Sequence, residues 1–164
     1  MQIKSQFTNI DGVIAYVTYE DADSFDHLLL KKVTQAYGVC FVGDKIVIVY
    51  SSKSNHWILP GGSIEEGETF EECLKREVKE ESNMRVLSFA PIGYQEVLCE
   101  SKIIYQLRYL CIVEPYGDFV SDPDGSITEI KLIDPTDYKQ YFDWGEIGDR
   151  IMERALEMKK NYKL

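Results

Sequence analysis

Three glutamates, Glu77, Glu80 and Glu81, are spaced so that a helix would gather their carboxylates on one side. An α-helix turns about 100° per residue, so the three side chains share roughly a third of its circumference. Cys73 and Leu74 project over much the same arc about one turn earlier, so this face begins as core and ends as negative charge. Carboxylates turned toward an interior repel one another and lose hydration. A hard divalent cation such as Mg²⁺, which prefers oxygen ligands, would compensate them.

A solvated acidic face is the alternative interpretation of the same glutamates. The opposite side of the helix, however, already has the composition of a face in water. Its residues are Glu72, Lys75, Lys79 and Ser82. We therefore favour an inward-facing acidic cluster.

The helix itself is predicted over residues 70–82, and its two ends carry separate signals. Thr69 and Glu72 form the pattern of a capping box at the start. No glycine or proline interrupts the segment, and Asn83 follows at the position where a left-handed residue often ends a helix. Upstream, residues 56–59 have the pattern of a short strand, which a Pro-Gly-Gly turn terminates. The unit is a strand, a glycine-rich loop and a helix.

Residues 62–84 resemble the Nudix box, which is a glycine, five residues, a glutamate, seven residues and then Arg-Glu-apolar-any-Glu-Glu-any-Gly-apolar. A match of this many typed positions at fixed spacing is far more specific than a lone glycine motif. Asn83 stands where the family has glycine, a substitution that touches a turn and no ligand. The matching positions are Gly62, Glu68, Arg76, Glu77, Val78, Glu80, Glu81 and Met84.

The resemblance implies an α+β fold, the Nudix-type αβα sandwich, with a mixed β-sheet and the box as a loop-helix-loop. It also implies Mg²⁺ as the cofactor, with Mn²⁺ as the alternative ion. In that scheme Glu77, Glu80 and Glu81 are metal ligands, and Gly62 offers its backbone carbonyl as another. Any one of the glutamates could instead serve as the general base, and the resemblance leaves that role open.

Arg76 and Glu68 are predicted to support the same site. The guanidinium of Arg76 could clamp a phosphate or form a scaffold ion pair with Glu68. A planar fork that orients carboxylates fits the second role, which we favour. The neighbouring acidic residues Glu65, Glu66 and Glu71 are interpreted as solvated charges.

The resemblance also implies another carboxylate from outside the box, for which Asp122, Asp124 and Glu129 are candidates. The segment 122–125 also has the composition of a plain turn, and we favour that interpretation. Two lone histidines, His27 and His56, have no partner at ligand spacing. Four aromatic residues could stack on a base but are more typical of a core: Tyr37, Trp57, Tyr94 and Tyr105.

Length and composition agree with a single Nudix-like domain over residues 1–164, with residues 1–34 as a candidate N-terminal extension. The formal charge of −10 argues against a nucleic-acid surface. It allows a small phosphorylated nucleotide, because bound metal reverses the local field. No apolar run is long enough to span a membrane, and no signal peptide is recognised. The scattered Cys40, Cys73, Cys99 and Cys111 favour reduced thiols in a cytoplasmic protein.

The rest of the chain predicts a sheet around the box and a final helix. Strands are predicted at residues 13–19, 37–42, 45–51, 86–92, 94–99, 103–113 and 129–133, with a hairpin turn at Gly43-Asp44. An amphipathic helix is predicted from about residue 145 to 160, with Ile147, Ile151, Ala155, Leu156 and Met158 as core candidates. The segment 20–33 is interpreted as a loop or a hairpin extension.

The resemblance implies Mg²⁺-dependent hydrolysis of a nucleoside diphosphate linked to another moiety, with water attacking phosphorus. The alternatives are a non-catalytic, regulatory nucleotide-binding Nudix domain and an isoprenoid diphosphate isomerase, which needs a cysteine and a glutamate. The complete set of glutamates favours hydrolysis. Residues that mark subfamilies for ADP-ribose, dinucleoside polyphosphates or NADH are missing, so the substrate stays open. Leu28–Leu30 could cover the sheet or form an interface, and we favour a homodimer.

Overall fold

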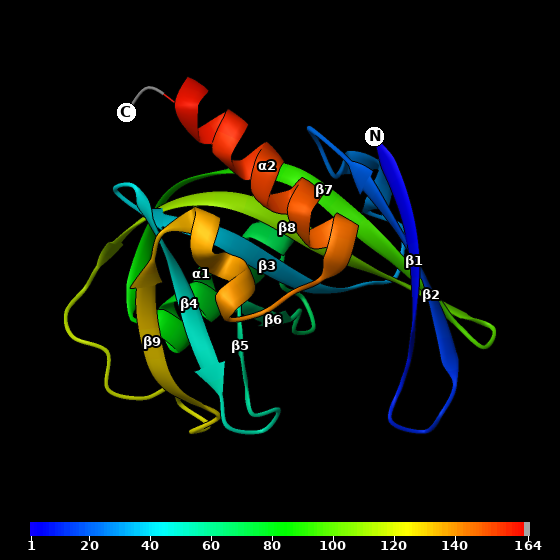
Figure 1. Ribbon diagram of the computed structural model, residues 1–164, viewed down its shortest axis with the longest axis horizontal. Helices are drawn as coiled ribbons and strands as arrows, with labels where there is room; N and C mark the ends of the chain where they lie inside the picture. Colours follow the sequence, from blue (N-terminus) through cyan, green and yellow to red (C-terminus); the bar gives the residue numbers. More distant parts are fainter. Residues whose placement is uncertain (163–164) are drawn as a thin grey trace.

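The computed structural model describes residues 1–162 and places nine strands in one mixed β-sheet (Figure 1). The strands are β1 (Gln2–Thr8), β2 (Ile14–Asp21), β3 (Val33–Val42), β4 (Lys45–Ser51), β5 (His56–Ile58), β6 (Gly61–Ser63), β7 (Met84–Cys99), β8 (Lys102–Pro115) and β9 (Ile127–Ile133). The helices are α1 (Phe70–Ser82) and α2 (Gly145–Asn161), with short 3₁₀ turns η1 (Asp26–Leu28) and η2 (Pro135–Gln140).

The strands follow the order β1-β2-β7-β8-β3-β4-β5, while β6 pairs with β3 and β9 pairs with β4. Only the β3–β8 pair is parallel among the described pairs, and the others are antiparallel. The mixed sheet expected from the resemblance is therefore confirmed. Because β6 pairs with the central strand β3, the chain that enters α1 is held against the middle of the sheet.

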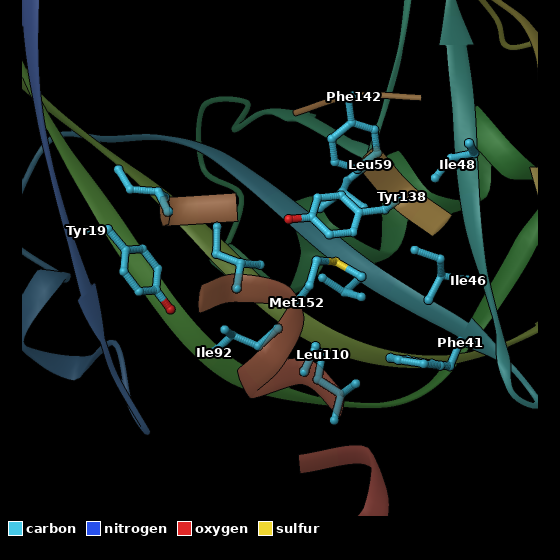
Figure 2. Close-up of a cluster of buried hydrophobic side chains, with 14 of the residues drawn as sticks. Tyr19, Phe41, Ile46, Ile48, Leu59, Ile92, Leu110, Tyr138, Phe142 and Met152 are labelled. Atoms are coloured by element: carbon cyan, nitrogen blue, oxygen red, sulfur yellow. The ribbon is translucent and has the colours of Figure 1, made fainter. Parts of the chain in front are cut away.

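The two helices cover opposite faces of the sheet, each over its own hydrophobic cluster. Alternation along the strands supplies both clusters: Phe41 and Ile46 belong to the α2 side, whereas Cys40 and Val47 belong to the α1 side. Figure 2 shows the α2-side cluster, in which Met152 of the helix lies among sheet residues. The predicted αβα sandwich is confirmed.

The predicted elements need correction at several ends. The two strands expected at 86–92 and 94–99 are one strand, β7, whose pairing with β8 shifts register near Gly93. In α2, Met152 is a buried core residue that the prediction omitted, whereas Leu156 and Met158 pack only at the margin. The apolar pattern predicted the helix correctly, but it did not predict which turn of the helix is buried most deeply in the core.

The N-terminal hairpin continues the central sheet. Strand β1 was not predicted, because its exposed residues show no apolar alternation, and it is held by pairing with β2. Strand β2 in turn pairs with β7. Between β2 and β3, Leu28 is buried while Leu29 and Leu30 are exposed. The homodimer therefore stays a prediction, with these two leucines as its candidate apolar surface.

Two further expectations concern cysteines and membranes. The four cysteines are free, and three of them are buried, which agrees with reduced core thiols. Within residues 1–162, no helix combines the length and the apolar character that crossing a bilayer requires.

Candidate functional site

Helix α1 is positioned by the caps that the sequence predicted. The Thr69 hydroxyl accepts the Glu72 backbone N–H at 3.1 Å, and the Glu72 carboxylate accepts the Thr69 N–H at 2.9 Å. The helix ends at Asn83, whose φ of 54° and ψ of 42° are left-handed. The Asn83 side chain also donates to the Asp118 carbonyl at 3.0 Å. The start of the helix is therefore capped by its own residues, and its end is also held to the loop that contains Asp118.

The sequence analysis placed one residue of α1 on the wrong face of the helix. Ser82 was assigned to the solvated face, but it is buried together with Cys73, Leu74 and Val78. Its hydroxyl donates to the Val78 carbonyl at 2.6 Å, one turn back. A serine can satisfy itself on its own helix in this way, so its polarity did not indicate its exposure.

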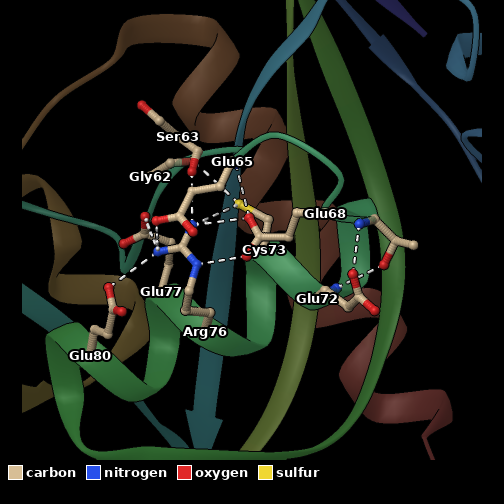
Figure 3. Close-up of polar contacts among 10 residues, drawn as sticks. Gly62, Ser63, Glu65, Glu68, Glu72, Cys73, Arg76, Glu77 and Glu80 are labelled. Carbon is tan, nitrogen blue, oxygen red and sulfur yellow. Dashed lines mark hydrogen bonds and ion pairs between the residues drawn. The ribbon is translucent and has the colours of Figure 1, made fainter.

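Arg76 is the centre of a network of carboxylates (Figure 3). Its Nε and Nη2 bind the two oxygens of Glu68 at 2.6 and 3.0 Å, and Nη2 also donates to the Ser63 carbonyl at 2.9 Å. Its Nη1 contacts Glu77 at 3.0 Å and Glu80 at 3.2 Å. The guanidinium thus holds the loop before α1 against the acidic face of the helix, as a forked donor can.

Glu81 is held by the backbone of β6, whereas Glu77 and Glu80 are held by Arg76. The Gly61 N–H donates to Glu81 Oε2 at 3.0 Å. Burial raises the pKa of Glu81 to about 8, and the charges of Glu77, Asp122 and Asp124 act in the same direction. Burial also raises the pKa of Glu77, against the opposing effect of Arg76. The site therefore gathers more carboxyl groups than its own side chains can stabilise in the ionised form.

The loop before β9 supplies the opposite wall. Asp122, Asp124 and the α1 glutamates line one polar cavity of about 280 Å³. Asp122 is buried and accepts from Ser126 Oγ at 2.9 Å and from Ile127 N at 3.1 Å, so it shapes the turn as well. Of the three outside candidates, Glu129 does not line this cavity.

The donor set of the cavity fits a hard divalent cation, since the acidic residues Glu77, Glu80, Glu81 and Asp122 line it. Within residues 1–162, no three acidic, histidine or cysteine side chains already converge as a metal site. Arg76 Nη1 lies between Glu77 and Glu80 instead.

Gly62 makes room for this arrangement. A Cβ there would lie 2.6 Å from Glu77 Oε1, so only glycine leaves the carboxylate its place. The Gly62 carbonyl accepts from the Cys73 thiol at 3.7 Å.

Gly61→Ala and Gly62→Ala are expected to fail in different ways. At Gly61, where φ is +153°, a Cβ would lie 2.4 Å from the Ala36 carbonyl oxygen. This backbone clash is expected to cost about 2–3 kcal/mol of folding stability. At Gly62 the obstacle is the end of a flexible side chain, so urea unfolding should show a loss below about 1 kcal/mol and the defect should be in activity. Equal losses of stability in the two variants would contradict this reading.

Most of the other candidates lie away from the cavity. Trp57 packs against Tyr50 and Tyr141. Tyr94 and Tyr105 donate to Glu20 and Glu96. Neither histidine lines the cavity: His27 contacts the ring of Tyr94, and His56 is exposed on β5.

Tyr37 is the candidate aromatic residue that lies beside the site, where Gly61 packs against it. Arg108, its partner on β8, received no role from the sequence. The available signal was a single cation in an otherwise apolar stretch of strand.

This fold and motif place the chain in a known family. The model of the NUDIX domain matches residues 32–155, and the chain belongs to that family. A curated relative, YtkD of Bacillus subtilis (strain 168), provisionally named an 8-oxo-dGTP diphosphatase, is 34% identical over 76 residues. That match covers 46% of this chain and 48% of the relative, so the aligned part spans about half of the relative's length.

Solved structures show the same fold at low identity. The Bacillus subtilis pyrophosphohydrolase BsRppH (E68A mutant) superposes with a TM-score of 0.62 at 20% identity, covering 96% of each chain. The NUDIX domain of Shewanella oneidensis NrtR, complexed with ADP ribose, gives a TM-score of 0.60 at 18% identity, covering 82% of this chain and 92% of that one.

Proposed function

We propose that this chain is a divalent-metal-dependent pyrophosphohydrolase. Its reaction would be hydrolysis of a nucleoside diphosphate linked to another moiety, with water attacking phosphorus. The observation that carries the proposal is the cavity in which Glu77, Glu80 and Glu81 face the Asp122–Asp124 turn. Acidic side chains gathered around a polar cavity repel a phosphorylated ligand unless cations are bound there, and they are the ligands that such cations need.

In this proposal Glu77, Glu80 and Glu81 hold Mg²⁺ or Mn²⁺, with the Gly62 carbonyl as a further oxygen ligand. A bound divalent ion supplies charge neutralisation for the phosphates and acidity for a coordinated water. Arg76 can release Glu77 and Glu80 through Nη1 and still keep its contacts to Glu68 and Ser63 through Nε and Nη2. Arg76 and Glu68 would then position the loop and the helix without contacting substrate.

The isomerase alternative finds little support in the thiols. Cys40 and Cys111 are buried side by side in the sheet. Cys73, the thiol nearest the glutamates, is also buried, and burial raises its pKa to about 12, so a reactive thiolate is disfavoured. One observation supports the alternative of a regulatory, non-catalytic domain. The chain shares its fold with the NUDIX domain of NrtR, whose structure is a complex with ADP ribose.

A nucleotide panel tests the proposal. Nucleoside triphosphates including 8-oxo-dGTP, the compound in the relative's name, ADP-ribose, and nucleotide sugars are incubated with the protein in Mg²⁺ or in EDTA. We expect release of phosphate or pyrophosphate from at least one compound, with Mg²⁺ only. Melting shifts without turnover across the panel would favour the regulatory domain. An isomerised isoprenoid diphosphate with no phosphate release would favour the isomerase.

A further inference from the structure

The side chain of Asn83 connects the end of α1 to the loop between β8 and β9, which spans residues 116–126. Its Nδ2 donates to the Asp118 carbonyl at 3.0 Å, and its own carbonyl accepts the Tyr116 N–H at 3.0 Å. The backbone of Asn83 is left-handed, with a φ of 54°. Glycine, which the Nudix box has at this position, adopts the same conformation but has no side-chain amide to donate. The hydrogen bond to Asp118 is therefore a contact that this chain gains from its departure from the motif.

Beyond its first residues the 116–126 loop stands away from α1. Two further contacts hold its start: Lys79 Nζ lies 5.2 Å from the centre of the Tyr116 ring, and Phe119 packs on the hydrophobic cluster of the α1 side. After Phe119 the chain is poorly packed, and Val120 is 86% exposed. Helix and loop instead line a cavity of about 520 Å³, whose walls are Arg76, Lys79, Glu80 and Asn83 from α1 and Asp118, Val120, Ser121 and Pro123 from the loop. Packing does not fix this part of the loop, so its hydrogen bonds matter more.

The same loop carries Asp122 into the acidic cavity. Residues 119–121 alone separate Asp122 from Asp118, the residue that Asn83 holds. Asp122 is buried and lines the acidic cavity, where its charge contributes to the raised pKa of Glu81. Pro123 lines both this cavity and the one beside Asn83, so the two cavities adjoin. A movement of the loop at Asp118 would therefore move Asp122 relative to the glutamates of α1.

We propose that Asn83 is a positioning residue for the metal site. Its side-chain amide holds the 116–126 loop so that Asp122 adds an oxygen ligand to the cation bound by the glutamates of α1. Hydrogen bonds behind a ligand fix where its oxygens lie, and their loss weakens metal binding although they do not touch the ion. This role rests on the proposed function, because it presupposes the metal site.

The first test needs no metal. Backbone ¹⁵N order parameters of residues 117–121 are measured in EDTA in wild type and in Asn83→Gly, which keeps the left-handed turn and removes the amide. We expect these order parameters to fall in the variant to about 0.6 or less, the range of flexible backbone. Order parameters that are equal in the two proteins would overturn the proposal.

Asn55→Gly is the matched control. Asn55 also has a positive φ, of 55°, is exposed in the turn between β4 and β5, and lines neither cavity. It therefore undergoes the same chemical change in a similar backbone conformation. The order parameters of residues 117–121 should be those of wild type in this control.

The second test measures Mn²⁺ affinity by calorimetry in a double-mutant cycle with Asp122→Asn, which keeps an acceptor for the Ile127 N–H. Asn83→Gly should weaken Mn²⁺ binding about fivefold, as the loss of one hydrogen bond implies, and Asn55→Gly should change it by less than about twofold. If Asn83 acts through Asp122, Asn83→Gly has no further effect in Asp122→Asn. The same fivefold loss in both backgrounds, or no loss in either, would show that Asn83 does not position Asp122.

The outcomes separate this proposal from the hydrolase. If Mn²⁺ binding follows the expected cycle but no compound of the nucleotide panel is hydrolysed, the role of Asn83 stands and the hydrolase is wrong. If nucleotides are hydrolysed with Mg²⁺ but Asn83→Gly leaves the Mn²⁺ affinity unchanged, the hydrolase stands and the role of Asn83 is wrong. A wild-type protein that binds no Mn²⁺ would overturn both.

Discussion

Glu80→Gln is expected to lower kcat about a thousandfold or more, which corresponds to about 4 kcal/mol of transition-state stabilisation. The substitution keeps the shape of the side chain but removes the negative charge that a divalent ion needs. Glu80 is 36% exposed and its described partner is Arg76, so the variant should fold normally. Initial rates at saturating Mg²⁺, with Mn²⁺ binding measured by calorimetry, separate lost metal affinity from lost turnover.

Glu66→Gln is the matched control for this variant. Glu66 lies in the same motif, is exposed, and does not line the acidic cavity. The same chemical change there should leave kcat within about twofold, because an exposed loop charge contributes little. If Glu80→Gln kept more than a tenth of wild-type activity, the acidic face of α1 would not be the metal site.

Most of the structure of the Nudix box was predicted from interactions between residues that are close in sequence. The capping box at Thr69 and the left-handed Asn83 are set by neighbours within four residues, so the sequence alone predicts them. The ion pair of Arg76 with Glu80 follows from helical spacing in the same way. The ion pair of Arg76 with Glu68 was also predicted, but its bidentate geometry depends on how the loop folds back and could not be read from spacing.

The parts that the sequence left open, such as Asp122, or missed, such as β1, depend on contacts between distant segments. Asp122 is 41 positions beyond Glu81, and only the pairing of β9 with β4 brings that turn to α1. Strand β1 exists because β2 offers it an edge, not because its own residues alternate. The burial of Arg108 could not be predicted, because the residues near it in sequence do not show that it lies inside the sheet without a paired carboxylate among the described residues. Single-sequence patterns do not encode such pairings.

Metal-free protein is expected to lose stability as the pH rises from about 5 to 8, and Glu81→Gln should remove most of that loss. Burial gives Glu81 a pKa of about 8 in the folded protein, against an ordinary value of about 4.5 for a glutamate in water. Below both values the carboxyl is protonated in either state, and no penalty arises. Between them the unfolded chain releases its proton while the folded protein retains it, so folding weakens with pH. The full effect is on the order of 5 kcal/mol.

Thermal melting in EDTA at pH 5, 6, 7 and 8 measures this effect in wild type and in Glu81→Gln. Glutamine resembles the protonated carboxyl and can still accept the Gly61 N–H. Groups with lowered pKa values, such as Glu68 and Asp21, act in the opposite sense, but their contribution is lost only at acid pH, outside this range. The same slope in both proteins would show that Glu81 is not the group responsible.

Mg²⁺ should reverse the loss of folding stability with rising pH if Glu81 is a ligand. A cation binds the ionised carboxylate, so it competes with the proton that burial favours. Below pH 8 the Mg²⁺ affinity of wild type should therefore rise by up to about tenfold per pH unit, whereas the affinity of Glu81→Gln should be lower and vary less with pH. Stabilisation by Mg²⁺ that grows with pH in wild type alone would connect the raised pKa of Glu81 to the metal. A pH-independent Mg²⁺ affinity would place the ion on Glu77 and Glu80 without Glu81.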